Sequence, residues 1–335
     1  MPSHSPIRPT TASLAAAALL MSLAACATPE TPTTPEEIEP AAVDVCATPT
    51  GAAVEAVTAT GELGDVPEVT FDAGLAVESA ERQVIVEGAG RPVEDGSLTG
   101  ISFVVYNGTT GLLLEEIAYD EGGPYPFMAQ SGNIPGILKA IGCVTEGSRV
   151  IAASLASEIY GPSSVDEPGF KVEPTDTIIL VLDVVRIIDR AWGADQPAVD
   201  GMPTVVLDAD GAPTVTLPDT AMPTELQLAV LKKGDGPVVA EHADVMVQYH
   251  GVSWDTREVF DSSWLRPAAS EFSLDGVIQG FTLAIAGQTL GSQVLVVAPP
   301  EFAYGPKTGA ANEHALAGQT LVFVIDILLA SEHAG

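Results

Sequence analysis

Between Val245 and Gly305 the chain reads Val245-Met-Val-Gln-Tyr249-His-Gly251, then Val259-Phe260-Asp261-Ser262-Ser263, then Phe272-Ser-Leu-Asp-Gly-Val277-Ile278-Gln-Gly280-Phe281, and then Ala298-Pro-Pro-Glu-Phe302-Ala-Tyr304-Gly305. Aromatic and aliphatic residues recur in this stretch beside short polar turns. Only a few of its side chains could transfer a proton. Such a composition suits an apolar binding site better than a hydrolytic centre.

The same pattern occurs once more, earlier in the chain, at a period of roughly 143 residues. The matching segments keep their order and nearly constant spacing: 104–108 with 247–251, 134–138 with 278–282, 146–150 with 290–294, 158–161 with 302–305, and 176–183 with 319–326. This alignment pairs Tyr106 with Tyr249. It predicts two copies of one domain, at 65–190 and 204–331, joined by a Gly- and Pro-containing linker at 191–203.

Both copies have the same predicted elements. Alternating apolar and polar residues predict strands at 83–87 and 225–231, each followed by a turn rich in glycine. Short helices are expected from Pro135 to Gly142 and from Gln279 to Ala286. One short helix among several non-consecutive strands indicates an α+β fold, in which an antiparallel sheet wraps around the helix.

Four motifs follow one another in the second copy: Tyr249-x-Gly251, Val259-Phe-Asp-Ser-Ser263, Val277-Ile-x-Gly-Phe281 and Phe302-Ala-Tyr-Gly305. In this combination they resemble the FK506-binding-protein (FKBP) type of peptidyl-prolyl cis-trans isomerase, over nearly all of 204–331. The resemblance implies two tandem FKBP-like domains, each an antiparallel curved sheet wrapped around a short helix. It also implies a pocket between sheet and helix that accepts a prolyl residue.

The resemblance assigns roles to residues of the second copy. The expected catalytic residues are Asp261, Tyr304, Phe260 and Ile278, and the expected substrate-binding residues are Tyr249, Phe272, Val277, Phe281 and Phe323. The Ile278 amide and the Tyr304 hydroxyl would bind substrate carbonyls, and Asp261 would face the reacting amide without acting as a base. Taken singly, the three Phe residues could be core aromatics, and Asp261 could cap a turn.

An apolar site with few polar groups is consistent with catalysis of rotation about an X–Pro bond. The barrier arises from amide resonance and is about 18–20 kcal/mol. Lowering it requires a site that favours the twisted amide, and neither a nucleophile, a metal nor a cofactor is expected. The five His residues are scattered, and Asp208-Ala-Asp210-Gly211 is interpreted as a turn because no Glu follows at calcium-loop spacing.

Both copies depart from the family pattern. The loop 306–318 of the second copy lacks the expected proline and has Ala315 at an isoleucine position. In the first copy, spacing aligns Ile117 and Ala118 with the pair Phe260-Asp261 of the second copy. Aligning Asp120 with Asp261 instead would require a gap in the alignment. Ile137 and Leu180 replace the Phe281 and Phe323 positions. The first copy is therefore expected to lack a counterpart of the carboxylate Asp261, and to be a scaffold, a peptide-holding module or a weak isomerase.

The charge of the chain excludes one class of partner. There are 45 acidic and 13 basic residues, and the formal net charge is −32. A surface of this sign repels phosphate backbones, so nucleic acid is not expected as a partner.

The N-terminal 26 residues are interpreted as an export signal, because a short apolar run from Ala12 to Ala25 follows Arg8. Its end, Leu23-Ala-Ala-Cys26, resembles the lipobox of bacterial lipoproteins, which implies a lipid anchor on Cys26 at the extracytoplasmic side of the cell membrane. The alternative is ordinary cleavage with Cys26 incidental. Residues 27–64, which begin with a Pro-, Thr- and Glu-rich tract, are expected to form a disordered tether.

Two further cysteines, Cys46 and Cys143, could pair in an oxidising location. The alternative is two free thiols, with Cys143 buried as a small apolar residue.

Together these features predict an exported peptidyl-prolyl isomerase that assists the folding of exported or cell-surface proteins and whose substrates are proline-containing polypeptides. Its active site is expected in the second copy, and FK506-like macrolides are candidate ligands. The alternative is a non-catalytic, holdase-like chaperone or partner-binding lipoprotein that uses the same apolar pockets.

Overall fold

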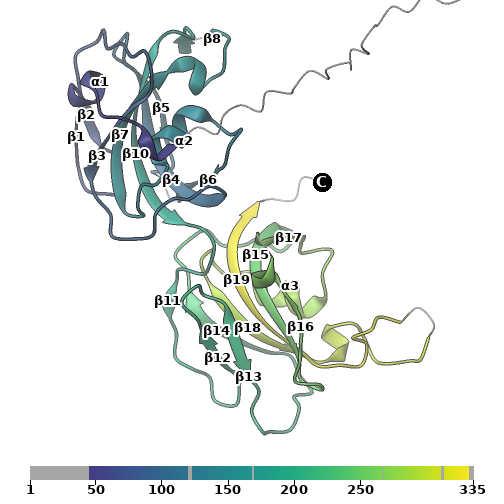
Figure 1. The fold of residues 1–335 in the computed structure, drawn as a ribbon. Helices are drawn as coiled ribbons and strands as arrows, with labels where there is room; N and C mark the ends of the chain where they lie inside the picture. The colour runs from purple at the N-terminus through teal and green to yellow at the C-terminus, as the bar shows by residue number, and fades with distance from the viewer. Residues whose placement is uncertain (1–44, 120–122, 168–169, 267, 311–312, 332–335) are drawn as a thin grey trace, which may run out of the picture. The chain divides into compact units, whose positions relative to one another are not determined.

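The computed structural model describes residues 45–119, 123–167, 170–266, 268–310 and 313–331 (Figure 1). Antiparallel strands are the main regular element of these residues, and 13 of the 19 strands belong to two sheets, one of six strands and one of seven. Each of the two sheets has one short α-helix packed on one face. The predicted α+β class and the antiparallel pairing are confirmed. No helix among the described residues is long and apolar enough to cross a membrane.

The N-terminal sheet unit has the strand order β3-β7-β10-β4-β5, with β6 paired to β4. The strands are β3 (Glu81–Val86), β4 (Ser97–Asn107), β5 (Leu112–Ile117), β6 (Tyr125–Ala129), β7 (Ser148–Leu155) and β10 (Thr177–Ile187). Helix α2 (Pro135–Ile141) begins with a proline, whose missing N–H costs nothing at the first helical turn. The helix buries Ile137, Ala140 and Ile141 against the inner face of the sheet.

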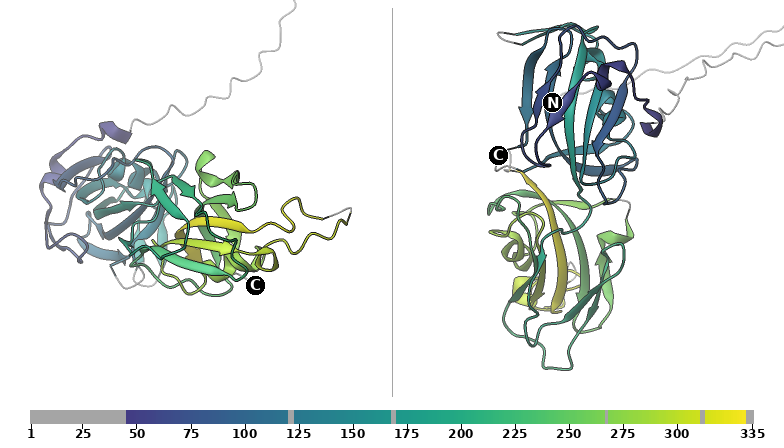
Figure 2. Two further views of the ribbon diagram at one scale, coloured as in Figure 1. Left: turned by 90° about the horizontal axis from the view of Figure 1, so that it is seen from below. Right: turned by 90° about the vertical axis from the view of Figure 1, so that its left-hand side faces the viewer.

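The C-terminal sheet unit has the order β14-β18-β19-β15-β16, with β17 paired to β15 and β11 added beside β14. The strands are β11 (Ala194–Asp195), β14 (Gln227–Lys233), β15 (Asp244–Ser253), β16 (Val259–Ser262), β17 (Ser270–Ser273), β18 (Gln293–Ala298) and β19 (Leu321–Ser331). Helix α3 (Gln279–Ile285) buries Phe281, Ala284 and Ile285. Figure 2 shows β19, in yellow, as the long central strand of this sheet.

The outer face of each sheet is also covered. A hairpin of β1 (Thr58–Thr60) and β2 (Glu68–Thr70), together with α1 (Ala52–Glu55), packs on the N-terminal sheet. A hairpin of β12 (Thr204–Leu207) and β13 (Pro213–Thr216) packs on the C-terminal sheet. With both faces buried, the central strands are mostly apolar; β10 is buried along most of its length and contains one buried carboxylate, Asp183.

The remaining short elements connect these parts. They are the 3-10 helices η1 (Val45–Ala47), η2 (Ala156–Glu158), η3 (Ser263–Leu265) and η4 (Pro300–Phe302), and a hairpin of β8 (Val165–Glu167) and β9 (Phe170–Val172).

Two predicted boundaries differ from the structure. Residues 45–64 of the predicted tether are folded, because Val54 and Val57 bury their side chains against the outer face of the sheet. Within the predicted linker 191–203, Ala194 and Asp195 pair with β14. The order of these two segments was not predicted from the sequence, because each of them contains only a few apolar residues. The predicted signal peptide, Cys26 and tether residues 27–44 lie outside the described residues.

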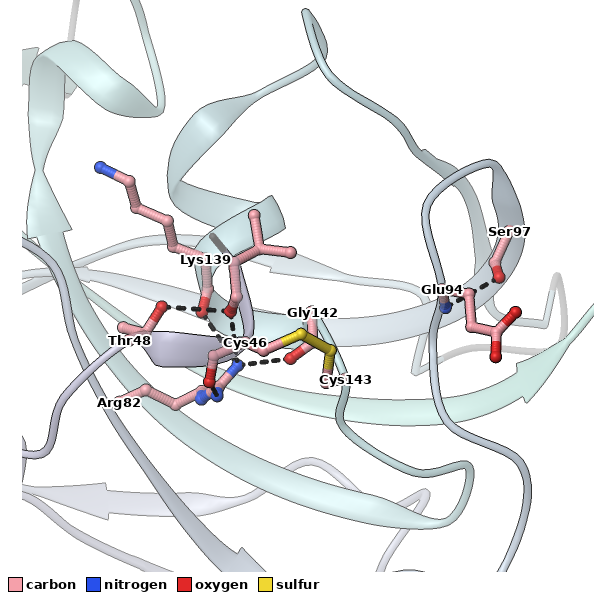
Figure 3. Close-up of a disulfide and its surroundings, with 9 residues drawn as sticks. Cys46, Thr48, Arg82, Glu94, Ser97, Lys139, Gly142 and Cys143 are labelled. Carbon is pink, nitrogen blue, oxygen red and sulfur yellow. Dashed lines mark hydrogen bonds between the residues drawn. A yellow bond between two sulfur atoms is a disulfide. The ribbon is translucent and has the colours of Figure 1, made fainter. Parts of the chain in front are cut away.

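The predicted disulfide between Cys46 and Cys143 is confirmed, with a Cα–Cα distance of 5.2 Å (Figure 3). It links residues 97 apart in sequence, and a closed loop of that length contributes about 4–5 kcal/mol in the chain-entropy model. The Arg82 guanidinium lies beside it and donates to the carbonyl oxygens of Gly142 at 2.7 Å and Cys46 at 3.0 Å. The bond therefore fixes the start of the described chain to the end of α2.

Candidate active site

Five aromatic rings from five elements meet on the inner face of the C-terminal sheet. They are Tyr249 on β15, Phe260 on β16, Phe272 on β17, Phe281 on α3 and Phe323 on β19. Phe281 is central: its ring centroid lies 5.6 Å from those of Phe272 and Phe323 and 6.1 Å from that of Tyr249. All these contacts are edge-to-face, the preferred aromatic arrangement. We call these five residues the aromatic cluster.

Gly251 explains how Phe260 reaches the cluster. A Cβ atom added at Gly251 would lie 2.5 Å from the Phe260 ring, so only glycine leaves the ring its place. A β-bulge between Gly251 and Val252 lets β16 carry Phe260 and Asp261 side by side at this edge. The Phe260 ring then packs edge-on against Phe323 at 5.5 Å between centroids.

Asp261 is the carboxylate of the site, and it is held in place by three neighbours. The Tyr249 hydroxyl donates to its Oδ2, the Ser262 backbone N–H donates to its Oδ1 at 2.8 Å, and Arg266 donates to Oδ1 at 3.1 Å. Arg266 also donates to the Tyr249 hydroxyl at 2.8 Å. Asp261, Tyr249 and Arg266 therefore form one polar triad at the rim of the aromatic cluster.

The triad keeps its charges. Burial alone would raise the pKa of Asp261, but the hydrogen bonds from Tyr249 and Ser262 and the charge of Arg266 hold it below its usual range. Burial, together with the hydrogen bond to Asp261, raises the pKa of Tyr249 to about 12. At neutral pH the site thus holds an ionised carboxylate beside a neutral phenol, so no proton needs to move within it.

The remaining predicted residues lie around the same cluster. Val277 and Ile278 precede α3 and pack, half-buried, against the aromatic core. Tyr304 follows η4, its side chain is 39% exposed, and burial together with the charge of Asp261 raises its pKa. The His314 ring stacks on Tyr304 with 3.6 Å between centroids. Among the described residues, neither the Ile278 amide nor the Tyr304 hydroxyl has a hydrogen-bond partner.

The nine predicted site residues therefore lie in one region, and three further side chains that were not predicted contribute to it. Arg266 completes the triad, Ser263 fixes the backbone N–H of Tyr249 at 2.7 Å, and His314 covers Tyr304. Arg266 could have been suspected, because it is one of only 13 basic residues and lies five positions after Asp261. Within the described part of the chain, no group of three His, Cys, Asp or Glu residues is placed to hold a metal ion.

The strand registers define which residues of the two units correspond. In the N-terminal unit Asp183 on β10 pairs with Arg149 near the start of β7. In the C-terminal unit Asp326 on β19 pairs with Gln293 at the start of β18, so the two aspartates correspond. The residues directly before these two aspartates are Leu182 and Ile325, which therefore correspond to each other. Leu182 pairs with Phe103 on β4, and Ile325 pairs with Tyr249 on β15. Phe103, and not Tyr106, is therefore the counterpart of Tyr249.

The sequence alignment of Tyr106 with Tyr249 is wrong for this reason. Tyr106 lies three residues beyond Phe103, and an odd displacement along a strand places a side chain on the opposite face. It packs in the outer cluster, with its ring 5.7 Å from that of Phe71. A single repeat period misaligned this strand because the loops of the two units differ in length.

The same register corrects the predicted loss of the carboxylate. Val105 pairs with Glu115, and the corresponding Gly251 pairs with Asp261. In both units the next pairing along the strands skips one residue, which is Leu114 in the N-terminal unit and Phe260 in the C-terminal unit. Leu114-Glu115 therefore corresponds to Phe260-Asp261, instead of the predicted Ile117 and Ala118. Phe127 on β6 corresponds to Phe272, since the two lie opposite Thr99 and Val245. The N-terminal unit keeps a carboxylate after all.

Comparisons with known proteins place the C-terminal half of this chain among named relatives. A family model described as FKBP-type peptidyl-prolyl cis-trans isomerase matches residues 236–328. A probable FK506-binding protein of Corynebacterium glutamicum is 39% identical over 116 residues, which are 35% of this chain and 96% of that protein. The FK506-binding protein of Streptomyces anulatus is 35% identical over 116 residues, 34% of this chain and 93% of that protein. Among solved structures, FkpA from Escherichia coli is similar at 28% identity and a TM-score of 0.29, over 40% of this chain and 53% of that one.

Proposed function

The chain belongs to the FKBP-type peptidyl-prolyl cis-trans isomerase family, and we propose that its active site is the aromatic cluster with the triad of Asp261, Tyr249 and Arg266. The family model matches residues 236–328, which contain all nine residues that the family resemblance assigns. Seven of the nine pack in one apolar cluster, Asp261 accepts a hydrogen bond from Tyr249, and the charge of Asp261 acts on Tyr304. The observation that carries the proposal is the fixed, ionised carboxylate at the rim of edge-packed aromatic rings. We further propose that the chain consists of two tandem FKBP-like domains, which the shared strand order supports.

The site acts by favouring the twisted amide over both planar forms. A prolyl ring packed on Phe281, between Phe272 and Phe323, leaves the X–Pro amide near Asp261. Twisting removes amide resonance and charge separation, so an apolar surface stabilises the twisted state relative to the planar ones. The Ile278 amide and the Tyr304 hydroxyl donate to substrate carbonyls and hold the chain on either side of the rotating bond.

Asp261 contributes a fixed field. Arg266 and Tyr249 prevent its carboxylate from turning, so its orientation costs no reorganisation when the amide rotates. Its low pKa keeps it ionised throughout the neutral range. Catalysis by this site should therefore be independent of pH between about 6 and 8.

A protease-coupled assay with a proline tetrapeptide, run on the full chain, tests the proposal. The double variant Phe281→Ala, Asp261→Ala should reduce the rate to that of the uncatalysed reaction. Asp261→Ala alone should lower kcat/KM with the fold intact, because the Asp261 side chain is 41% exposed. The matched control is Val324→Ala, which truncates a buried side chain on the outer face of the same sheet. Equal rates for the double variant and the control would refute the assignment.

We propose that the protein works outside the cytoplasm on proteins that fold there, anchored by a lipid on Cys26. The disulfide of Cys46 and Cys143 supports this, since such bonds persist in oxidising compartments. Metabolic labelling with a radioactive fatty acid should mark the wild-type protein and leave Cys26→Ser unlabelled. FK506-like macrolides are proposed to compete with peptide for the aromatic cluster, which inhibition in the same assay would reveal.

A further inference from the structure

The inner face of the N-terminal sheet holds a second apolar cluster, built on positions that correspond to the aromatic cluster. Its buried members are Phe103, Phe127, Ile137 and Leu180, and its half-buried members are Leu114, Ile134 and Tyr160. Ile137 takes the place of Phe281 on the helix, as the two helices begin and end at corresponding residues. The half-buried members give this cluster a solvent-facing surface, as Phe260 and Ile278 do in the other unit.

A carboxylate, Glu115, lies at the rim of this second cluster, and within the part of the chain that the structure describes it forms no ion pair with a Lys or Arg. Glu115 accepts a hydrogen bond from the Tyr160 hydroxyl at 2.8 Å. The position of Tyr249 is taken by Phe103, which has no hydroxyl, and no Lys or Arg occurs between residues 107 and 134, where a counterpart of Arg266 would fall. Lys139, on the adjacent helix, is paired with Glu158 at 2.5 Å. Charge complementarity therefore favours a cationic group beside Glu115.

We propose that this cluster is a second binding site for proline-containing segments, and that it prefers segments in which a lysine or arginine precedes the proline. The preference for proline rests on the proposed function of the corresponding cluster in the C-terminal unit. The preference for a basic residue rests on Glu115, whose charge lacks the arginine that faces Asp261.

The second site binds without rapid turnover, because its two donors are already engaged. The Tyr160 hydroxyl donates to Glu115, and the Ile134 amide donates to the Asn133 side chain at 3.0 Å. Their counterparts, the Tyr304 hydroxyl and the Ile278 amide, are the groups assigned to substrate carbonyls in the C-terminal unit. A segment held at the second site would thus be retained on the same chain that carries the isomerase site, which raises its local concentration there.

Methyl NMR of the full chain, labelled at isoleucine δ1 methyl groups, tests this inference. The probes are three blocked peptides, Ala-Lys-Pro-Phe, Ala-Glu-Pro-Phe and Ala-Lys-Ala-Phe. We expect the lysine-proline peptide to shift the signals of Ile134 and Ile137 saturably, and to bind there about threefold more tightly than the glutamate-proline peptide, as for a partly exposed ion pair. Glu115→Gln should abolish that preference. Glu116→Gln, on the exposed side of the same strand, is the matched control and should retain it.

Three outcomes would overturn the inference. Shifts of Ile278 without shifts of Ile134 and Ile137 rule out the second site and leave the proposed active site standing. Equal shifts with the proline-free peptide reduce it to unspecific apolar contact. An unchanged lysine preference in Glu115→Gln removes the role of that carboxylate. Loss of isomerase activity is measured separately in the coupled assay, so failure of the proposed function is distinguishable.

Discussion

The N-terminal and C-terminal sheet units share a strand order but fill one position in opposite ways. In the C-terminal unit Gly251 leaves space that the Phe260 ring occupies. In the N-terminal unit the corresponding Val105 is 1% exposed and fills that space itself, and the smaller Leu114 stands at the position of Phe260. The two positions together hold the same number of side-chain carbon atoms in both units, but these are divided differently between the two strands. Phe260 can therefore join the proposed binding surface only because its neighbour on the next strand, Gly251, has no side chain.

The buried polar pairs differ as well. In the N-terminal unit Arg149 and Asp183 form an ion pair that is almost fully buried, and Arg149 also donates to the carbonyls of Gly61, Glu62 and Asp65. In the C-terminal unit Gln293 donates to Asp326 at 2.7 Å, and the Ala191 amide donates to the same carboxylate at 2.8 Å. Each pair fastens the segment that precedes its unit onto the sheet, one with a cation and one without.

The largest expected effect is loss of the N-terminal ion pair. Arg149→Met should lower the free energy of unfolding of that unit by about 3–5 kcal/mol, because the Asp183 charge is left buried. Gln293→Met removes one hydrogen bond to Asp326 and should cost the C-terminal unit only about 1–3 kcal/mol. Urea unfolding would separate the two, if circular dichroism reports on both units and the fluorescence of Trp192, Trp254 and Trp264, all of which follow the N-terminal unit, reports on the C-terminal unit. Equal losses would contradict the contrast between the pairs.

The second expected effect is a pH dependence that Asp326 gives to the stability of the C-terminal unit. Burial raises the pKa of Asp326 to about 6, so the folded unit binds a proton that the unfolded chain has released. The unfolding free energy should therefore fall as pH rises from about 4 to about 6, by an amount on the order of 3 kcal/mol. Asp326→Asn, measured against the wild type in urea at each pH, should abolish that fall. A constant difference between the two proteins across pH 4 to 7 would disprove it.

A third substitution converts the C-terminal unit to the N-terminal arrangement. Gly251→Val should displace the Phe260 ring, since the new Cβ would meet it at 2.5 Å. We expect kcat/KM in the coupled assay to fall by about 10–100-fold, as for displacement of a positioning contact. Val252→Ala, the next residue and part of the outer cluster, is the control and should retain activity. Retained activity in Gly251→Val would show that Phe260 is dispensable.

The smallest expected effect comes from the triad. Tyr249→Phe reproduces the Phe103 side chain of the other unit and removes the hydroxyl that bridges Asp261 and Arg266. Because Arg266 still holds Asp261, kcat/KM should fall by only about tenfold, the loss of about one hydrogen bond to a charged group. Tyr106→Phe, the residue that sequence spacing had matched to Tyr249, should leave kcat/KM unchanged. A comparable loss in Tyr106→Phe would contradict the register derived from the strands.

Much of the C-terminal site could be predicted from the sequence, because its motifs are local. Val259–Ser263 and Val277–Phe281 each place their side chains through a single strand edge or helix start, and all nine predicted residues converge. Arg266 was not predicted because it lies outside the motif Val259–Ser263. Only the turn of η3 brings its side chain back to Asp261. Residues 45–64 were missed because their order depends on a sheet formed by later residues.

The sequence was sufficient to predict the α+β class and the family of this protein, because turn residues and motif order are properties of neighbouring residues. Only the tertiary structure decided that Phe103 and Glu115, instead of Tyr106 and Ala118, face the second cluster. Side chains alternate between the faces of a strand, so a register offset by an odd number of residues exchanges core for surface. That register is set by bulges and by the pairing of distant strands, which spacing along the chain does not record.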